Sequence, residues 1–483
     1  MSPPSVQRTV LWTAEDAATA TNGRATSDWQ ASGVSIDTRS QEPGDLFVAL
    51  DGPNRDGHDF VAAALDKGAA AALVTRRPEG VGEDAPLLLV EDGLEALWAL
   101  GRAGRARSEA QIVGVTGSVG KTGTKEALRS CLSAQGRTAA SVASYNNHWG
   151  VPLSLARMAP TAEYGVFEIG MNHAGELGPL SRLVRPRVAV ITTVQPVHLA
   201  YFDNVLQIAD AKAEIFEGLE PGGTAVLNRD NAFFPNLLER AEAREIRRVI
   251  SFGRHPDANV RLLDCSLHAT CSSVHALVKD QPLDYCLSLP GEHWVLNSLA
   301  VLGAVWALGA DVSAAAAAFA RLEPMKGRGE RHLLACPEGR DGEFLLIDES
   351  YNANPTSMRA ALSVLGRSDT RGDGRRIAVL GDMLELGDSA QERHARLAEA
   401  VTGAGIDLVF TCGEAMAALH DALPKALRGA HTADSAGLAP IVSATVGGGD
   451  AVMVKGSLGS RMALVVEALM QPSRPPLRAA NGD

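Results

Sequence analysis

Short apolar runs alternate with amphipathic stretches along most of the chain. From residue 112 onward, the pattern predicts strands at 112–116, 164–169, 187–194 and 223–228, with helical segments between them. Further strands are predicted at 344–347, 377–380, 407–411 and 451–454, again separated by helical segments. This rhythm is typical of parallel sheets with crossover helices. The sequence therefore predicts an α/β protein with two doubly wound sheets.

The first hundred residues form a smaller unit of the same class. Strands are predicted at 44–50 and 72–75, joined by an alanine-rich helical stretch that reaches residue 71. A turn at 323–330 separates the two larger units. We expect three domains, at residues 1–107, 108–329 and 330–483. The Pro-, Arg- and Ala-rich tail after Pro472 is predicted to be disordered.

A glycine-rich turn follows the strand at 112–116 and opens a helix. Gly117 and Gly120 allow backbone N–H groups to converge on a polyphosphate, Lys121 adds a positive charge, and the Thr122 hydroxyl suits Mg²⁺. Val115 stands where the full phosphate-loop pattern has its first glycine, so this is a variant loop. The alternative is a plain strand-to-helix turn with a surface lysine.

Composition narrows the range of partners. The chain has 483 residues, 46% of them hydrophobic and 21% charged, and a formal net charge of −12, which disfavours non-specific binding to nucleic acid or to anionic membranes. Six cysteines occur without a Cys-x-x-Cys pair, so we expect neither zinc nor a disulfide framework. The N-terminus lacks the pattern of a secretory signal, and a reducing cytoplasm fits best.

The most apolar region, residues 296–322, is interrupted at Asn297, Asp311 and Ser313. Residues 309–313 resemble a turn with a helix N-cap. We expect two buried helices and no stable membrane insertion.

Polar residues near the ends of the predicted strands are candidates for chemistry. Glu168 is a carboxylate in an apolar strand, which indicates either a salt-bridge partner or a metal ligand beside a Mg-nucleotide. His198 follows the next strand and lies within reach of the same crevice. Lys212 belongs to a helix that starts near Asn204, and alone it is more typical of a solvated lysine.

Two further candidates allow two interpretations each. Asn297 is expected to begin the apolar helix, so helix capping and nucleotide contact are equally good interpretations. Asp348 ends a strand, and residues 349–358 after it form either a ligand surface or a loop that caps the next helix.

Together these residues resemble the Mur ligase family, the ATP-dependent amide ligases of peptidoglycan precursor synthesis. The similarity covers nearly the whole chain and is carried by Thr116–Thr122, Glu168, Pro196–His198, Ala211–Ile215, Gly291–His293 with Asn297, Gly327–Arg328, and Asp348. The resemblance implies an N-terminal uridine-nucleotide domain, a central domain like a P-loop ATPase and a C-terminal Rossmann-like domain.

Within the family, residues 348–358 and 379–387 are similar to the member that adds D-alanyl-D-alanine. The implied reaction is ADP-forming: ATP with Mg²⁺ activates UDP-N-acetylmuramoyl-tripeptide as an acyl phosphate, and the amine of D-alanyl-D-alanine displaces the phosphate. The resemblance also implies a cytoplasmic monomer. The asparagines at 352 and 354 argue against the tripeptide-forming Mur enzyme and folyl-polyglutamate synthetase, and the chain lacks the Asn-Lys pair of a nucleotide switch.

The resemblance assigns roles residue by residue. Catalysis would involve Lys121, Glu168, His198 and Lys212. Metal ligands would be Thr122, Glu168, His198 and a carbamylated Lys212. The nucleotide would be bound by Gly117, Ser118, Val119, Gly120, Lys121, Thr122, Gly123, Asn297, Arg328 and Asp348. The other substrates would be bound by Thr38, Arg39, Asn146, Asn147, Tyr351, Asn352, Asn354 and Ser357. Residues 322–330 would be a hinge for domain closure.

Three departures from the family pattern stand out. Val119 and Gly123 replace small hydroxyl residues of the loop. Trp294 follows His293 where the family usually has Asn. Arg461 comes three residues later than the arginine of the family's Lys-Gly-Ser-Arg run.

Overall fold

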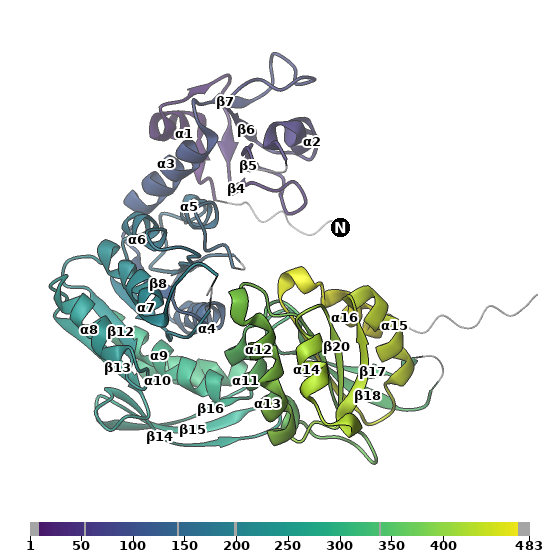
Figure 1. Cartoon of the computed structure of the whole chain (residues 1–483). Helices are drawn as coiled ribbons and strands as arrows, with labels where there is room; N and C mark the ends of the chain where they lie inside the picture. Colours follow the sequence, from purple (N-terminus) through teal and green to yellow (C-terminus); the bar gives the residue numbers. More distant parts are fainter. Residues whose placement is uncertain (1–8, 53–54, 143, 198–199, 338–339, 472–483) are drawn as a thin grey trace, which may run out of the picture.

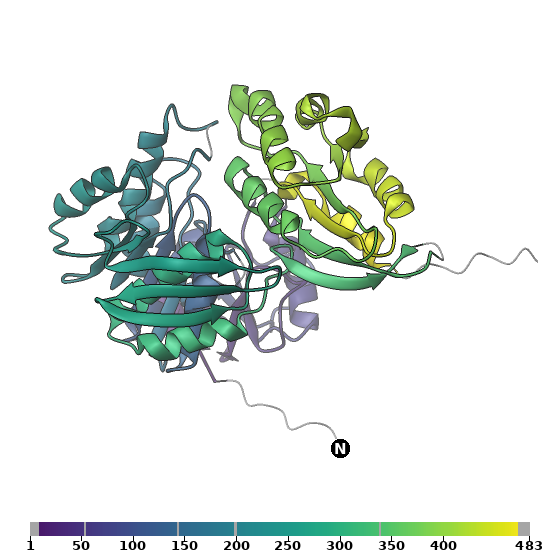
Figure 2. The same ribbon diagram turned by 90° about the horizontal axis from the view of Figure 1, so that it is seen from below.

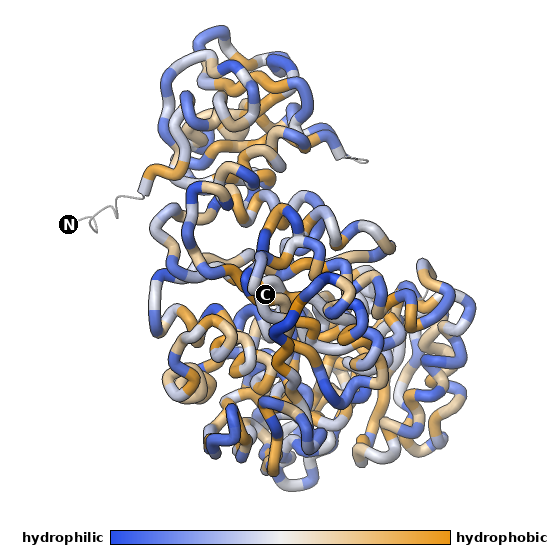
Figure 3. The backbone as a smooth tube through the Cα atoms, turned by 90° about the vertical axis from the view of Figure 1, so that its left-hand side faces the viewer, coloured by the Kyte–Doolittle hydropathy of each residue, from blue (hydrophilic) through white to orange (hydrophobic). Residues whose placement is uncertain are grey.

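A computed structural model describes residues 9–52, 55–142, 144–197, 200–337 and 340–471, and these form three lobes along the chain (Figure 1). The N-terminal lobe is purple in Figure 1, the central lobe teal and the C-terminal lobe green to yellow. Each lobe is a mixed α/β unit built on its own sheet, as the sequence predicts. In Figure 3, hydrophobic stretches of the backbone alternate with hydrophilic ones along the chain.

The described part of the N-terminal lobe contains a five-stranded sheet in the order β2-β7-β6-β5-β4. Its strands are β2 (Arg24–Ala25), β4 (Gly33–Ser35), β5 (Asp45–Val48), β6 (Ala71–Val74) and β7 (Leu87–Leu89), and β1 (Trp12–Thr13) pairs with β3 (Gln30–Ala31) beside it. The helices are α1 (Ala14–Thr21), η1 (Gly57–Phe60), α2 (Val61–Asp66) and α3 (Gly93–Ala106). β5 and β6 confirm the predicted strands. Every residue in them is buried, as expected of parallel strands covered on both faces.

The N-terminal and central lobes share a hydrophobic core. Leu153 and Ala156 of α5 (Gly150–Ala156), a helix of the central lobe, pack into the same buried cluster as the N-terminal strands and α3. The two helices approach closely at glycines: a Cβ at Gly104 of α3 would lie 2.4 Å from the carbonyl oxygen of Leu155. Trp12 also donates a hydrogen bond to the carbonyl of Ala156 at 2.9 Å. These contacts fix one lobe against the other.

Within the described residues, the central lobe has a nine-stranded sheet in the order β16-β15-β14-β13-β12-β11-β8-β10-β9. The strands are β8 (Gln111–Thr116), β9 (Thr138–Ala140), β10 (Tyr164–Glu168), β11 (Val188–Ile191), β12 (Thr224–Asn228), β13 (Arg248–Gly253), β14 (Val260–Leu267), β15 (Ser272–Val278) and β16 (Gln281–Leu287). β8, β10, β11 and β12 confirm the predicted strands. The antiparallel group β14 to β16, in the foreground of Figure 2, was not predicted.

Helices cover both faces of this sheet. α4 (Lys121–Ser133), α9 (Glu292–Leu308) and α10 (Val312–Ala318) pack on one face. α5, α6 (Leu177–Val184), α7 (Val205–Ala213), η2 (Glu214–Gly218) and α8 (Phe234–Glu242) pack on the other. α9 and α10 confirm the two buried helices: α9 ends at Leu308 with Gly309 as its C-cap, and Asp311 caps α10. No helix in the described part of the chain has the length and apolar character needed to cross a membrane.

The described residues of the C-terminal lobe form a six-stranded sheet in the order β17-β18-β22-β19-β20-β21. The strands are β17 (Glu330–Ala335), β18 (Glu343–Glu349), β19 (Arg376–Gly381), β20 (Leu408–Cys412), β21 (Arg428–Thr432) and β22 (Ala451–Lys455). The α-helices are α11 (Pro355–Gly366), α12 (Ala390–Ala395), α13 (Leu397–Gly403), α14 (Ala417–Ala422), α15 (Ser435–Thr445) and α16 (Ala463–Met470). Four strands were predicted, and the two edge strands β17 and β21 were not.

The domain boundaries at 107/108 and 329/330 stay a prediction. α3 ends at Ala106 and β8 begins at Gln111, and β17 begins at Glu330. The tail after Pro472, which was predicted to be disordered, lies outside the described residues.

Candidate active site

The phosphate loop connects β8 to α4 at the carboxyl edge of the central sheet. Gly117 and Gly120 have φ angles of 147° and 86°, a region that favours glycine. A Cβ at Gly117 would lie 1.9 Å from Oγ1 of Thr192, so the loop has no room for a side chain there. Gly120 is the N-cap of α4, and the N–H groups that begin this helix are therefore available to an anion.

The segment after β11 supports this loop. The predicted strand extended to residue 194, but β11 ends at Ile191. Beyond it, Thr192 donates its hydroxyl to the carbonyl of Val119 at 2.6 Å, and the carbonyl of Thr193 accepts from the N–H of Ser118 at 2.8 Å. These residues hold the loop in shape instead of extending the sheet.

Lys121 lies folded against the loop. Its Nζ donates to the carbonyl of Gly117 at 2.7 Å. Burial lowers the pKa of Lys121, the carboxylate of Glu168 opposes this shift, and the guanidinium of Arg328 adds to it. The amine therefore lies where it can bind an anion held by the loop.

A cavity of about 370 Å³ opens between the central and C-terminal lobes. It brings together most of the predicted nucleotide and acceptor residues. The predicted residues that line it are Ser118, Val119, Gly120, Lys121, Thr122, Gly123, Asn146, Glu168, Asn297, Arg328, Tyr351, Asn352, Asn354 and Ser357. Residues far apart in the sequence thus meet at the facing edges of two sheets, as the rule for open α/β sheets leads one to expect.

Glu168 ends β10 and is only 1% exposed. Its Oε1 accepts a hydrogen bond from Nδ2 of Asn146 at 2.7 Å, while its buried Oε2 has no hydrogen-bond partner among the described residues. In the same part of the chain Glu168 forms no ion pair, so the salt-bridge interpretation finds no support there. A buried carboxylate oxygen that lacks a hydrogen-bond partner at the cavity wall is a suitable ligand for a divalent cation.

Ser144 links the two lobes beside this carboxylate. Its Oγ lies 3.1 Å from Oγ1 of Thr122 and accepts from Nη2 of Arg328 at 3.2 Å. The Arg328 guanidinium also stacks on the ring of Tyr351, 4.3 Å from its centroid. Sequence reasoning missed Ser144, because a serine in a polar loop carries no distinguishing signal.

Asn297 does not begin its helix. α9 begins at Glu292 with Gly291 as its N-cap, so Asn297 lies in the second turn and helix capping is the wrong interpretation. Its side chain points toward the phosphate loop: a Cβ at Gly120 would lie 2.8 Å from Oδ1 of Asn297. The amide can therefore contact a ligand of that loop.

The asparagines after β18 are partly engaged within the protein. Asn354 caps α11 in a capping box with Ser357, and Oδ1 of Asn352 accepts from the N–H of Ala353 at 2.8 Å. Lys455, another residue missed from sequence, donates to the carbonyl of Asn352 at 2.9 Å and to Oε2 of Glu349 at 3.0 Å. These bonds fix the loop, whose remaining polar groups face the cavity.

Several predicted residues lie outside the lining of this cavity. Asp348 is buried and its carboxylate accepts from the N–H of Ser350 at 3.0 Å, so it shapes the turn after β18. Lys212, in the last turn of α7, is 2% exposed, which contradicts the solvated alternative. Burial and the nearby charge of Lys121 hold its pKa well below the usual range. His198 lies outside the described residues.

A second cavity, of about 590 Å³, lies at the N-terminal lobe. Thr38 and Arg39 line it, together with Trp149 from the central lobe. Arg39 is paired with Asp37, with Nη2 and Oδ2 2.6 Å apart. Asn147 is exposed, and its Oδ1 accepts from the N–H of Gly150 at the start of α5 at 2.9 Å. Arg461 lines a different, smaller cavity within the C-terminal lobe.

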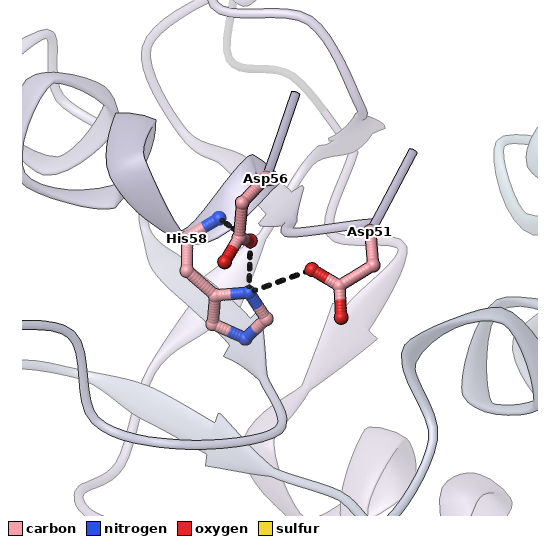
Figure 4. Close-up of side chains that lie close together, drawn as sticks. All are labelled: Asp51, Asp56 and His58. Carbon is pink, nitrogen blue, oxygen red and sulfur yellow. Dashed lines mark hydrogen bonds and ion pairs between the residues drawn. The ribbon is translucent and has the colours of Figure 1, made fainter. Parts of the chain in front are cut away.

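Asp51, Asp56 and His58 lie close together beside the second cavity (Figure 4). Nε2 of His58 accepts from the N–H of Thr75 at 3.0 Å, so the ring proton of a neutral imidazole is on Nδ1, which lies 2.7 Å from Oδ1 of Asp56. Both ring nitrogens of His58 are thus engaged in hydrogen bonds within the protein. We therefore interpret the cluster as a structural contact rather than a cation site.

Comparison with known families gives matches over most of the chain. The Mur ligase family catalytic domain matches residues 30–105, the Mur ligase middle domain residues 115–305, and the Mur ligase glutamate ligase domain residues 338–458. UDP-N-acetylmuramoyl-tripeptide--D-alanyl-D-alanine ligase from Escherichia coli is 35% identical, with 91% of this chain and 93% of that protein covered. The enzyme of the same name from Rickettsia prowazekii is 31% identical, with 90% and 94% covered.

Solved structures agree with these matches. A crystal structure of MurF from Acinetobacter baumannii superposes with a TM-score of 0.81 at 29% identity and covers 95% of this chain and 99% of that one. MurF ligase from Thermotoga maritima, in complex with ADP, gives a TM-score of 0.72 at 27% identity, with 90% and 96% covered. The three-lobe arrangement is thus shared with these proteins along nearly their whole length.

Proposed function

The chain belongs to the Mur ligase family, and we propose that it is an ADP-forming ligase that joins D-alanyl-D-alanine to UDP-N-acetylmuramoyl-tripeptide. The observation that carries the proposal is the 370 Å³ cavity, where a phosphate loop faces the asparagine loop that follows β18. The two relatives described above are named for this activity, and about a third of their residues are identical to those of this chain.

The reaction requires activation of a carboxylate. A carboxylate oxygen is a poor leaving group, so the γ-phosphoryl group of ATP is first transferred to the terminal carboxylate of the tripeptide, which gives an acyl phosphate and ADP. The amine of D-alanyl-D-alanine then attacks the acyl carbon, phosphate leaves, the amine loses a proton and the amide forms. Two anions must meet in the first step, so the protein has to align them and neutralise charge.

The described residues can do both. The N–H groups of residues 117–123 and the Lys121 amine would hold the β- and γ-phosphates, and Asn297 and Arg328 would contact the nucleotide from α9 and from the inter-lobe segment. Asp348 fits a positioning role, because its carboxylate is already bonded to Ser350 N–H and it lies outside the cavity lining. On nucleotide binding, the Lys121 amine would exchange its hydrogen bond with the carbonyl of Gly117 for contacts with the phosphates.

Thr122 and Glu168 fit a Mg²⁺ ion, since Oε2 of Glu168, which has no hydrogen-bond partner among the described residues, and the Thr122 hydroxyl would supply oxygen ligands from one wall. When bound, Mg²⁺ supplies positive charge to the phosphate oxygens. We propose His198 and a carbamylated Lys212 for a second ion. The low pKa of the buried Lys212 amine supports this, because only an uncharged amine adds to CO₂.

The remaining predicted residues are assigned to the other substrates as part of this proposal. We propose that the uridine nucleotide binds in the 590 Å³ cavity near Thr38 and Arg39, with Asn146 and Asn147 beside its peptide. Tyr351, Asn352, Asn354 and Ser357 would receive D-alanyl-D-alanine. The monomeric state and the cytoplasmic location stay predictions.

The test is release of phosphate from ATP in the presence of UDP-N-acetylmuramoyl-tripeptide, with D-alanyl-D-alanine or single amino acids as the acceptor. We expect release, together with a mass gain of one dipeptide, only with D-alanyl-D-alanine. Turnover with another acceptor would change the assigned substrate. Turnover that needs no acceptor would rule out a ligase.

A further inference from the structure

An indole forms part of the wall of the nucleotide cavity. Trp294 lies in the first turn of α9, is half-buried, and lines the same cavity as residues 118–123. One turn later on the same helix, Asn297 reaches Gly120 at the start of α4. Trp294 and Asn297 therefore present one face of α9 to the first turn of α4.

The ring of Trp294 lies directly against Gly123 of α4. A Cβ at Gly123 would lie 2.8 Å from Cη2 and 3.1 Å from Cζ3 of the Trp294 ring. Gly123 lies inside α4, in an ordinary helical backbone that any residue can adopt. Glycine in a helix costs about 0.5–1 kcal/mol relative to alanine, so the conformation itself gives no reason for it. Gly123 and the Trp294 ring thus form one paired feature.

We propose that the indole of Trp294 stacks on the purine base of the nucleotide. The absence of a side chain at Gly123 makes room for this indole. This inference rests on the proposed ATP-dependent function and adds a specificity residue to it. The phosphates belong at the loop of residues 117–120, and Trp294 lines the same cavity as this loop, so the base of a nucleotide bound there can lie within reach of the indole. The cavity also contains Ala360 and Ala361 of α11, which offer no polar group to a base.

The chemistry of the Trp294 side chain determines how the site would recognise the base. Asn297 faces the phosphate loop, so its amide is not directed at the part of the cavity that Trp294 occupies. An indole offers a broad π face, and stacking tolerates a change of base because every base has such a face. The geometry therefore points to a site that recognises purine nucleotides through the base plane, with weak selection between adenine and hypoxanthine at this position.

The experiment measures binding of ADP and of IDP by calorimetry, without tripeptide or acceptor. Trp294→Ala is expected to raise the Kd about 5- to 100-fold, by the same factor for both nucleotides. Trp294→Phe keeps a ring and is expected to retain most of the affinity. The melting temperature of each variant shows whether it is folded, so a loss of binding in a folded Trp294→Ala protein is attributable to the ring.

A double variant tests the pairing. Gly123→Ser is expected to weaken binding and to lower the melting temperature, because its side chain meets the indole. Adding Trp294→Asn to Gly123→Ser is expected to recover the melting temperature. The proposal is overturned if Trp294→Ala changes the Kd less than twofold, if it weakens ADP but not IDP, or if the double variant melts no higher than Gly123→Ser. Failure of the unmodified protein to bind ADP would instead contradict the proposed function.

Discussion

At the scale of single residues, the candidate site contains a buried carboxylate, Glu168, whose hydrogen-bonding capacity is only partly used within the described residues. Oε2 of Glu168 is buried and has no hydrogen-bond partner among the described residues, although Oε1 is held by Asn146. An ionised carboxylate without a full set of partners destabilises the protein until a cation arrives. Catalytic positions commonly carry such a cost in stability.

Glu168→Gln is therefore expected to act in opposite directions on stability and on turnover. The neutral amide removes a buried charge, so the melting temperature of the ligand-free protein should rise by roughly 2–4 °C. Acceptor-dependent phosphate release should fall at least about 100-fold, because the amide is a poor magnesium ligand. Glu239→Gln, on the exposed side of α8, is the matched control and should change neither quantity. A Glu168→Gln variant that retains turnover would remove this residue from the site.

Asp56 gives a prediction for pH. Its carboxylate accepts from the backbone N–H of His58, from the His58 ring and from Arg76, and these bonds lower its pKa. Because the folded-state pKa lies below the unfolded value of about 3.9, the carboxylate stabilises the fold above that pH. The stabilisation is lost as the pH falls through the interval between the unfolded and the folded pKa.

The measurement is the difference in melting temperature between the unmodified protein and Asp56→Asn. We expect a difference of a few degrees near pH 8 that shrinks below about pH 4. Asp66→Asn, at an exposed position of α2, should show no difference at any pH. A difference that grows as the pH falls below about 4 would contradict the assigned cause.

At the scale of elements, close helix packing sets the relation between the first two lobes. α3 contacts α5 through Gly101 and Gly104, and a Cβ at Gly104 would lie 2.4 Å from the carbonyl oxygen of Leu155. The atom it would meet is backbone, which cannot turn aside as a side chain can.

Gly104→Ala should therefore lower the melting temperature, by an amount that corresponds to about 1–3 kcal/mol of overpacking. Gly403→Ala is the matched control, because Gly403 also lies in a helix but has nothing within 4 Å of the position that a Cβ would take. It should be neutral or slightly stabilising. Equal effects of the two substitutions would mean that α3 and α5 can move apart at little cost.

The elements also show which patterns the sequence reveals. β8, β11, β19 and β22 are buried along nearly their whole length, so they are continuous apolar runs that are easy to recognise. β14, β17 and β21 lie toward sheet edges or alternate between buried and exposed positions, so their signal resembles that of loops. The phosphate loop and Glu168 were found from their chemistry. Ser144 and Lys455 were missed because their roles arise only from contacts with residues distant in the sequence.

At the scale of the whole molecule, the central and C-terminal lobes each supply one wall of the 370 Å³ cavity. Arg328, in the segment between the two sheets, reaches Ser144 of the central lobe and stacks on Tyr351 of the C-terminal lobe. A ligand in this cavity must therefore change the environment of both lobes at once, and the segment at 322–330 is a suitable hinge.

Hydrogen exchange measures this directly. On addition of ADP with Mg²⁺, we expect slower exchange of amides in residues 118–123 and also in residues 355–361, at the start of α11. Residues 272–287, in β15 and β16, line no part of the cavity and serve as the internal control. Protection restricted to the phosphate loop would mean that the nucleotide is bound by the central lobe alone.

The core shared by the first two lobes has a consequence for biosynthesis. The strands and α3 of the N-terminal lobe are synthesised first, but Leu153 and Ala156, which complete their packing, are added some fifty residues after α3 ends. Domains generally fold as units during translation, N-terminal first. Here the leading lobe stays incompletely packed until α5 has left the ribosome. A nascent chain halted before residue 150 should thus be open to proteases and chaperones, and a chain long enough for α5 to have left the ribosome should be protected.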